Sequence, residues 1–260
     1  MTPPKGYVNT EYLQAVGEFV KQTKQRSYAL MRIQPGHKVL DVGCGPASDT
    51  IQLAELVGHT GKVFGVDYDQ AMIDEADQRA EKAGVTAWVK HLFADSNSLP
   101  FETNSFNACR GERVFQHLLD PARALSEMTR VTTTGGWIVV LDGDWGSFSI
   151  DTTEVDIERR LVRVLADRGS HNGYAGRKLY RQFKQQQLTD ITVELHPLLV
   201  RDYAFARQGA LLDQAEHIAL SAGILTDEEV HRWRTSLEQA DSKGVFFASV
   251  NLVMAVGRKP

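Results

Sequence analysis

Two glycines preceded by an acid follow a short apolar run near the start of the chain. Val39–Val42 is apolar except for Asp41, and Gly43 and Gly45 come directly after it. The residues from 48 to 57 then have the apolar spacing of an amphipathic helix. A buried strand, a glycine turn and a helix N-terminus in this order form a ligand cradle, because glycine lets the backbone approach a ligand closely and accepts positive φ.

The charge of Asp41 and the glycine spacing indicate which ligand this cradle takes. The dinucleotide fingerprint G-x-G-x-x-G is incomplete, because Ser48 stands at the place of the third glycine. Asp41 would crowd a pyrophosphate, whereas it could hold a cationic ligand through a water or a hydrogen bond. The pattern therefore favours a sulfonium nucleoside over NAD.

A second acid ends the next predicted strand. Asp67 follows residues 63–66 and comes 24 residues after Gly43. A carboxylate at this strand end can accept two hydrogen bonds from a ribose diol. Tyr68, the next residue, and Met72, in the first turn of the following helix, are further candidates for cofactor binding. A place in the core explains Met72 equally well.

The run 39–48 resembles motif I of the class I S-adenosylmethionine-dependent methyltransferases, in which an acid precedes G-x-G. It is similar to the branch that contains the ubiquinone and menaquinone methyltransferases and many small-molecule methyltransferases. Ala47 stands at the last glycine of the family pattern D-x-G-x-G-x-G, and a turn residue with negative φ would accept its methyl group. The resemblance implies S-adenosylmethionine as the cofactor.

Further cofactor residues follow from this resemblance and from strand order. Asp95, after the predicted strand 88–93, matches the family's aspartate that bonds the adenine amino group, with the backbone of Ser96 beside it. The predicted strand 106–110 ends at Arg110. Because ligands in open α/β sheets bind beyond the carboxyl ends of the strands, we expect Arg110 to line the cofactor near its methionine end.

His117 is the candidate catalytic residue. The family's usual pattern after the fourth strand is an aliphatic pair, a variable residue and histidine, and here the run reads Val114, Phe115, Gln116 and His117. An imidazole with a pKa near the ordinary value of about 6.5 can accept a proton from a substrate hydroxyl at neutral pH. The sequence equally allows that His117 only anchors the following helix, and a carbon or amine acceptor would need no base.

The element pattern predicts one α/β domain over residues 1–260, with a three-layer, Rossmann-like, seven-stranded mixed sheet and a helical lid over the substrate site. Residues 1–34 form an N-terminal helical cap, in which Tyr7, Tyr12 or Tyr28 could close over the ligands. Residues 38–142 form the cofactor-binding core, and the helical insertions 145–188 and 203–242 form the lid. The predicted strands are 39–42, 63–66, 88–93, 106–110, 137–142, 191–200 and 246–256. The predicted helices are 10–33, 48–57, 69–83, 120–131, 152–166, 174–187, 205–222 and 227–240.

Composition narrows the class of protein. A hydrophobic content of 42% and a charged content of 24% are typical of a soluble globular chain. The net charge of −4 does not predict a basic face for nucleic acid. No apolar run reaches the length of a membrane span, and residues 1–10 lack the apolar core of a signal peptide. With Cys44 and Cys109 expected to be free thiols, we expect a cytoplasmic protein.

Three function classes remain at this stage. The first is a methyltransferase acting on a small molecule in secondary or cofactor metabolism, at oxygen or carbon, or alternatively at the nitrogen of a small amine. The second is an NAD(P)-dependent oxidoreductase, disfavoured by Asp41, the missing third glycine and the lack of a Tyr-x-x-x-Lys pair near the fifth strand. The third is an S-adenosylmethionine-binding protein without catalysis. No metal site is predicted, since Asp142 and Asp144 have no third ligand nearby. A homodimer is left open.

Overall fold

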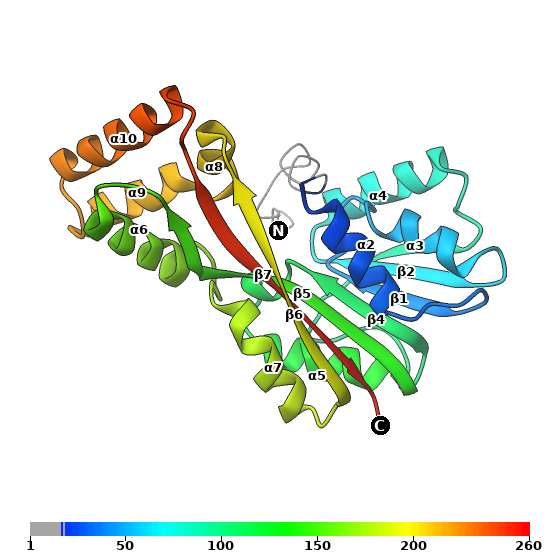
Figure 1. Cartoon of the computed structure of the whole chain (residues 1–260). Coiled ribbons are helices and arrows are strands. Elements are labelled where there is room, and N and C mark those ends of the chain that lie inside the picture. The colour runs from blue at the N-terminus through cyan, green and yellow to red at the C-terminus, as the bar shows by residue number, and fades with distance from the viewer. Residues whose placement is uncertain (1–16, 18) are drawn as a thin grey trace.

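One seven-stranded sheet organises the computed structural model, which describes residue 17 and residues 19–260 (Figure 1). The strand order is β3-β2-β1-β4-β5-β7-β6. The strands are β1 (Lys38–Val42), β2 (Lys62–Asp67), β3 (Val89–Phe93), β4 (Phe106–Glu112), β5 (Thr132–Ile150), β6 (Thr189–Val200) and β7 (Ala248–Arg258). Neighbours among β1 to β5 pair in parallel, and β7 is antiparallel to both β5 and β6. The predicted α/β class and the mixed seven-stranded sheet are confirmed.

Helices cover both faces of this sheet (Figure 1). One face carries α2 (Lys21–Leu30), α3 (Thr50–Val57) and α4 (Gln70–Lys82), and the other carries α5 (Pro121–Val131) and α7 (Ala175–Gln185). The alternation of side chains along β1 divides the core between the two faces, because successive residues of a strand point to opposite sides. Val39 packs with Leu53 of α3, whereas Leu40 packs with Leu125 of α5 and Leu179 of α7.

Two helices begin at aspartate caps that the sequence predicts. Asp120 caps α5, its carboxylate accepting a hydrogen bond from the Arg123 N–H at 2.9 Å, and Pro121 occupies the first helical position. Asp69 caps α4 in the same way through the Ala71 N–H. Both predicted starts are confirmed within one residue.

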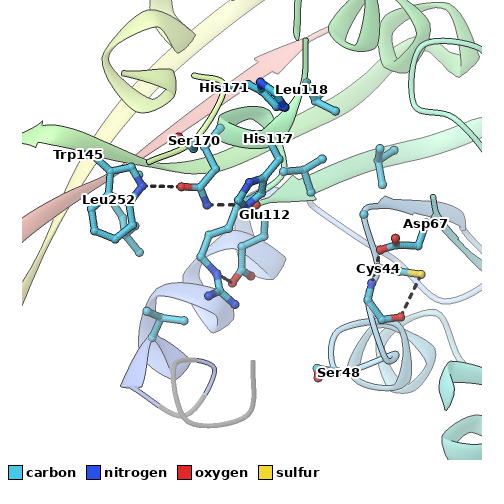
Figure 2. Close-up of a pocket in the computed structure, with 18 of the residues that line it drawn as sticks. Cys44, Ser48, Asp67, Glu112, His117, Leu118, Trp145, Ser170, His171 and Leu252 are labelled. Carbon is cyan, nitrogen blue, oxygen red and sulfur yellow. Dashed lines mark hydrogen bonds and ion pairs between the residues drawn. The ribbon is translucent and has the colours of Figure 1, made fainter. Parts of the chain in front are cut away.

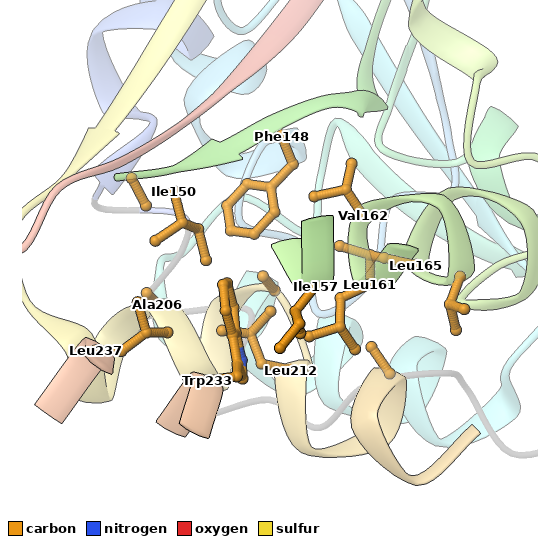
Figure 3. Packing of buried hydrophobic residues seen from close by; sticks show 14 of the residues in the cluster. Phe148, Ile150, Ile157, Leu161, Val162, Leu165, Ala206, Leu212, Trp233 and Leu237 are labelled. Atoms are coloured by element: carbon orange, nitrogen blue, oxygen red, sulfur yellow. The ribbon is translucent and has the colours of Figure 1, made fainter. Parts of the chain in front are cut away.

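Strands β5, β6 and β7 carry a second group of helices at one end (Figure 1). These are α6 (Val155–Arg168), α8 (Tyr203–Gly209), α9 (Leu212–Ser221) and α10 (Asp227–Ser242). Figure 3 shows Phe148 of β5, Leu161 of α6 and Trp233 of α10 in the core that they share. We call these four helices, with the strand ends that they cover, the upper lobe.

The structure corrects the prediction for this part of the chain in three ways. The strand expected to end at Asp142 continues to Ile150, because β7 pairs with it as far as Ala248. The helix expected over 205–222 is two helices, separated at Leu211, which has a φ of +51°. The insertion 145–188 is not all lid, because α7 buries Leu179 and Phe183 against the sheet.

The structure also bears on the expectations for the cysteines, for a membrane span and for the N-terminal cap. Cys44 and Cys109 are free and buried, as expected. Within the described part of the chain, no helix combines the length and the apolar character needed to cross a bilayer. The expectations for Tyr7, Tyr12 and the first half of the cap 1–34 fall outside the described residues.

Candidate active site

A cavity of about 560 Å³ lies at the carboxyl ends of β1 to β4 and continues beneath the upper lobe (Figure 2). Its first part, the loop half, is lined by the segments after β1, β2 and β3, at residues 43–49, 67–72 and 94–97. Its second part, the lobe half, lies between α6, α8 and the upper ends of β5, β6 and β7. Between them is the junction, formed by the end of β4 and the 3₁₀ turn η1 (Phe115–His117).

The glycine turn lines the loop half as predicted. Gly43 and Gly45 have φ values of +71° and +51°. A Cβ on Gly43 would lie 2.1 Å from Cγ2 of Val114, so only glycine fits against the junction there. The prediction for Ala47 is wrong, because this buried residue has a φ of +66°. It holds the left-handed conformation of the glycine that it replaces, at a cost of about 1–2 kcal/mol.

Asp67 supports the turn as well as facing the cavity. Its Oδ2 accepts a hydrogen bond from the Gly45 N–H at 2.9 Å, and its Oδ1 accepts one from the Asp69 N–H at 3.0 Å. Burial raises the pKa of this carboxyl. Tyr68 stacks on Phe93 with ring centroids 5.3 Å apart, and both Tyr68 and Met72 line the loop half. The structure therefore brings these predicted cofactor residues together.

The segment after β3 adds a residue that sequence reasoning missed. Asp95 and Ser96 line the loop half, and Asp95 Oδ1 accepts a hydrogen bond from the Asn97 N–H at 2.8 Å. The Asn97 side chain also lines it, and its Oδ1 is buried with no hydrogen-bond partner among the described residues. Such an orphaned acceptor fits a ligand that donates an N–H or O–H. The only signal in the sequence is a polar residue directly after Ser96.

Arg110 and Asp41 do not line the cavity, which corrects the prediction for both. Arg110 is 1% exposed, and its guanidinium contacts Asp41 at 3.1 Å, Asp49 at 3.3 Å and Glu112. Burial raises the pKa of Asp41 to about 7 although Arg110 lowers it. Asp41 is therefore balanced by a guanidinium beneath the glycine turn and has no direct reach to a ligand.

This group of buried charges also holds α2 on the sheet. Lys24 Nζ lies 2.9 Å from Asp49 Oδ2 and 3.5 Å from Glu112 Oε1. Ser27 Oγ accepts a hydrogen bond from Arg110 Nε at 3.0 Å, and the Tyr28 hydroxyl donates to Asp49. We call Lys24, Asp41, Asp49, Arg110 and Glu112 the buried ion-pair network. Tyr28 belongs to its surroundings and does not line the cavity.

His117 lies at the junction, where the sequence placed it (Figure 2). Burial, with smaller contributions from the neighbouring Arg113 and His171, lowers its pKa to about 4. The expectation of a pKa near 6.5 is therefore wrong, and the imidazole is neutral at physiological pH. Buried Asp142 holds the turn η1 that carries His117, because its carboxylate accepts a hydrogen bond from the Gln116 N–H at 3.3 Å.

The lobe half is lined mainly by apolar side chains. Gln116 connects it to the junction, because its Oε1 accepts a hydrogen bond from Trp145 Nε1 at 2.6 Å (Figure 2). Phe19 and Phe205 both line it and pack against each other with ring centroids 5.1 Å apart. The other apolar lining residues are Val20, Phe148, Leu165, Leu198, Val200, Ala206, Ala210, Leu211, Val250 and Leu252. In the described part of the chain, His, Cys, Asp and Glu form no group of three that could hold a metal ion.

Comparisons with known proteins agree with this architecture. A family model described as a methyltransferase domain matches residues 33–194. An uncharacterized 37.1 kDa protein in transposon TN4556 of Streptomyces fradiae is 35% identical over 225 residues, covering 86% of this chain and 63% of that protein. A demethylmenaquinone methyltransferase of Bacillus cereus is 36% identical over 122 residues, covering 47% of this chain and 51% of that enzyme.

A solved structure extends the likeness to the whole chain. It is geranyl diphosphate C-methyltransferase from Streptomyces coelicolor A3(2), in complex with Mg²⁺, geranyl diphosphate and S-adenosyl-L-homocysteine. The TM-score is 0.59 at 15% sequence identity, with 100% of this chain and 89% of that chain covered. The chain spans only 51% to 63% of the length of the two curated relatives above.

Proposed function

Since the chain belongs to the class I S-adenosylmethionine-dependent methyltransferase family, we propose that it methylates an oxygen or carbon atom of a small molecule. One observation carries this proposal. A single cavity joins the predicted cofactor residues of the loop half to an apolar chamber, with His117 between the two. A protein that only bound the cofactor would not need the second chamber.

The loop half offers hydrogen-bond acceptors and apolar side chains that suit S-adenosylmethionine. Asp67 would accept hydrogen bonds from the ribose hydroxyls. Asp95, Ser96 and the orphaned Oδ1 of Asn97 would face the adenine edge, and Tyr68 and Met72 would pack on its ring. The bound cofactor supplies an electrophilic methyl group on its sulfonium sulfur.

The chain's own contribution to the reaction is alignment and proton transfer. Holding two reactants in attack geometry is worth roughly 7–11 kcal/mol of the barrier. The imidazole of His117 is neutral, which is the protonation state of a general base, so it would accept the proton of an acceptor hydroxyl while the oxygen or the adjacent carbon is methylated. Methylation of an amine that is already uncharged would not use this base.

Binding of S-adenosylmethionine but not of NADH is the first expected result. Ser48 stands at the third glycine of the dinucleotide fingerprint, so the glycine turn at Gly43 and Gly45 is incomplete as a dinucleotide site. Calorimetry on the purified chain measures both ligands. Mass spectrometry of a cell extract incubated with the enzyme and labelled cofactor then identifies the methylated product. Tighter binding of NADH, or labelled cofactor that is never consumed, would contradict the proposal.

Replacement of Asp67 by alanine should weaken S-adenosylmethionine binding by about 2–4 kcal/mol, which is roughly 30- to 1000-fold in Kd. The variant loses the bonds to the ribose, the bond to the Gly45 N–H in the glycine turn and the bond to the Asp69 N–H. Asp67→Asn should cost less, because the amide oxygen keeps one of these backbone bonds.

Titration calorimetry of the two Asp67 variants, with Asp74→Ala as the matched control, measures this effect. The Asp74 carboxylate accepts a hydrogen bond from Gln70 on the exposed side of α4 and does not line the cavity, so its loss should leave the Kd unchanged. An unchanged Kd in a folded Asp67→Ala protein would mean that another residue holds the ribose.

Three earlier expectations remain predictions. They are the cytoplasmic location, the absence of nucleic-acid binding and the homodimer. The two buried free thiols support the first of them, because such thiols are ordinary in a reducing compartment.

A further inference from the structure

The described residues that line the lobe half carry no fixed charge. No Asp, Glu, Lys or Arg is among them, and His171 is their one titratable side chain. Placing an ion in such a chamber would cost a large part of its hydration energy without a partner to replace it. The chamber therefore favours an uncharged occupant.

The charged residues at the junction are already paired with one another. Glu112 lies 3.5 Å from Lys24 Nζ and 3.2 Å from Arg113 Nε and also contacts Arg110. Lys24 has a second partner in Asp49 at 2.9 Å. An ammonium or carboxylate group on the acceptor would have to break these pairs, so the junction does not compensate for the lack of charge in the chamber.

Ser170 is a polar residue in the chamber wall (Figure 2). It lies on the loop between α6 and α7, and its Oγ is buried without a hydrogen-bond partner among the described residues. Trp145 and Gln116, the neighbouring polar groups, satisfy each other at 2.6 Å. A buried hydroxyl with no partner is unfavourable, so a ligand group that bonds it would gain affinity.

We propose that the methyl acceptor is an uncharged molecule with an apolar body and a hydroxyl group, and that Ser170 binds this hydroxyl. The inference rests on the proposed methyl transfer and names the substrate class of the same site. The apolar body fills the lobe half, and Ser170 and His117 lie in the cavity wall beside its polar end. The lack of unpaired counter-charges disfavours a diphosphate or an ammonium group on the acceptor.

Four probes of one shape test the charge preference. They are 2-naphthol, naphthalene, 2-naphthoate and 2-naphthylmethylammonium, each titrated into the full chain saturated with S-adenosylhomocysteine, which cannot donate a methyl group. Calorimetry should show 2-naphthol binding at least tenfold more tightly than either charged probe. Equal or tighter binding of a charged probe, or no binding of any probe, would overturn the uncharged class.

Ser170→Ala tests the role of the hydroxyl. The variant should bind 2-naphthol about five- to tenfold more weakly and naphthalene equally well, which is the loss of one neutral hydrogen bond. Ser149→Ala is the matched control, because Ser149 Oγ bonds Ser249 Oγ at 3.1 Å and does not line the cavity. An unchanged affinity for 2-naphthol in folded Ser170→Ala would overturn the assignment of Ser170.

The order of the titrations distinguishes a wrong acceptor class from a wrong proposed function. S-adenosylhomocysteine is titrated first, without a probe. No binding at that stage overturns the methyl-transfer function and the inference with it. Binding there, followed by tight binding of 2-naphthoate, overturns the acceptor class alone.

Discussion

Replacement of Arg110 by methionine is expected to lower the free energy of unfolding by about 3–5 kcal/mol, because it removes one side of a buried ion pair. The guanidinium is 1% exposed and contacts Asp41, Asp49 and Glu112. Methionine would fill much of the space but leave three buried carboxylates opposed mainly by Lys24. Urea denaturation at pH 7.5 measures the loss.

The pH dependence of this loss has a definite sign. Burial already raises the folded-state pKa of Asp41 to about 7, and without Arg110 it would rise further. A folded-state pKa above the unfolded value of about 3.9 means that the folded state binds more protons between the two. Stability of the Arg110→Met variant should therefore recover as pH falls from 7.5 towards 5, since protonation removes the unpaired charge.

Arg123→Met is the control for Arg110. Its guanidinium is 55% exposed and lies 3.6 Å from Glu127, so the change should cost less than about 1 kcal/mol. Adding Glu112→Gln to Arg110→Met should restore part of the lost stability. A single Arg110→Met variant as stable as the parent would show that the network carries no net ion-pair energy.

Replacement of His117 by alanine is expected to lower turnover by roughly 10²–10⁴, while cofactor affinity stays within a few-fold. His117 lines the junction, so its loss removes the proposed proton acceptor and leaves the loop half intact. The measurement compares the rate of methyl transfer to the acceptor found in the extract with the Kd for S-adenosylmethionine. His231→Ala, on the exposed side of α10, is the matched control.

The lowered pKa of His117 sets the pH profile of the parent enzyme. Because the pKa lies at about 4, turnover should stay level from pH 7.5 to about pH 5.5 and fall only as the pH approaches 4. A fall in turnover centred near pH 6.5 would contradict the lowered pKa of His117.

Stability should respond to the same residue. Between about pH 6.5 and 4 the unfolded state binds a proton at His117 that the folded state does not, so stability falls as pH falls through this window. His117→Gln should remove this contribution, which denaturation at pH 7 and pH 4.5 measures. Full turnover in a folded His117→Ala protein would end the general-base role and leave His117 as an anchor of η1.

Local features of the sequence determined the class of fold and most of the loop half. Gly43 and Gly45 after an apolar strand, Asp67 at the next strand end and the Asp120–Pro121 helix start all depend on residues close in the chain. Glycine turns and caps are governed by backbone conformation and short-range hydrogen bonds, which is why they were predictable.

Only the tertiary structure decided the roles of Asp41 and Arg110. These residues are 69 positions apart, and the parallel pairing of β1 with β4 sets them opposite each other. The length of β5 likewise depends on β7, which comes from the end of the chain. The pKa of His117 and the orphaned hydroxyl of Ser170 depend on burial by segments distant in sequence. Strand pairing and burial are properties of the packed chain, so a local pattern places a residue at the site without determining its charge or its partner.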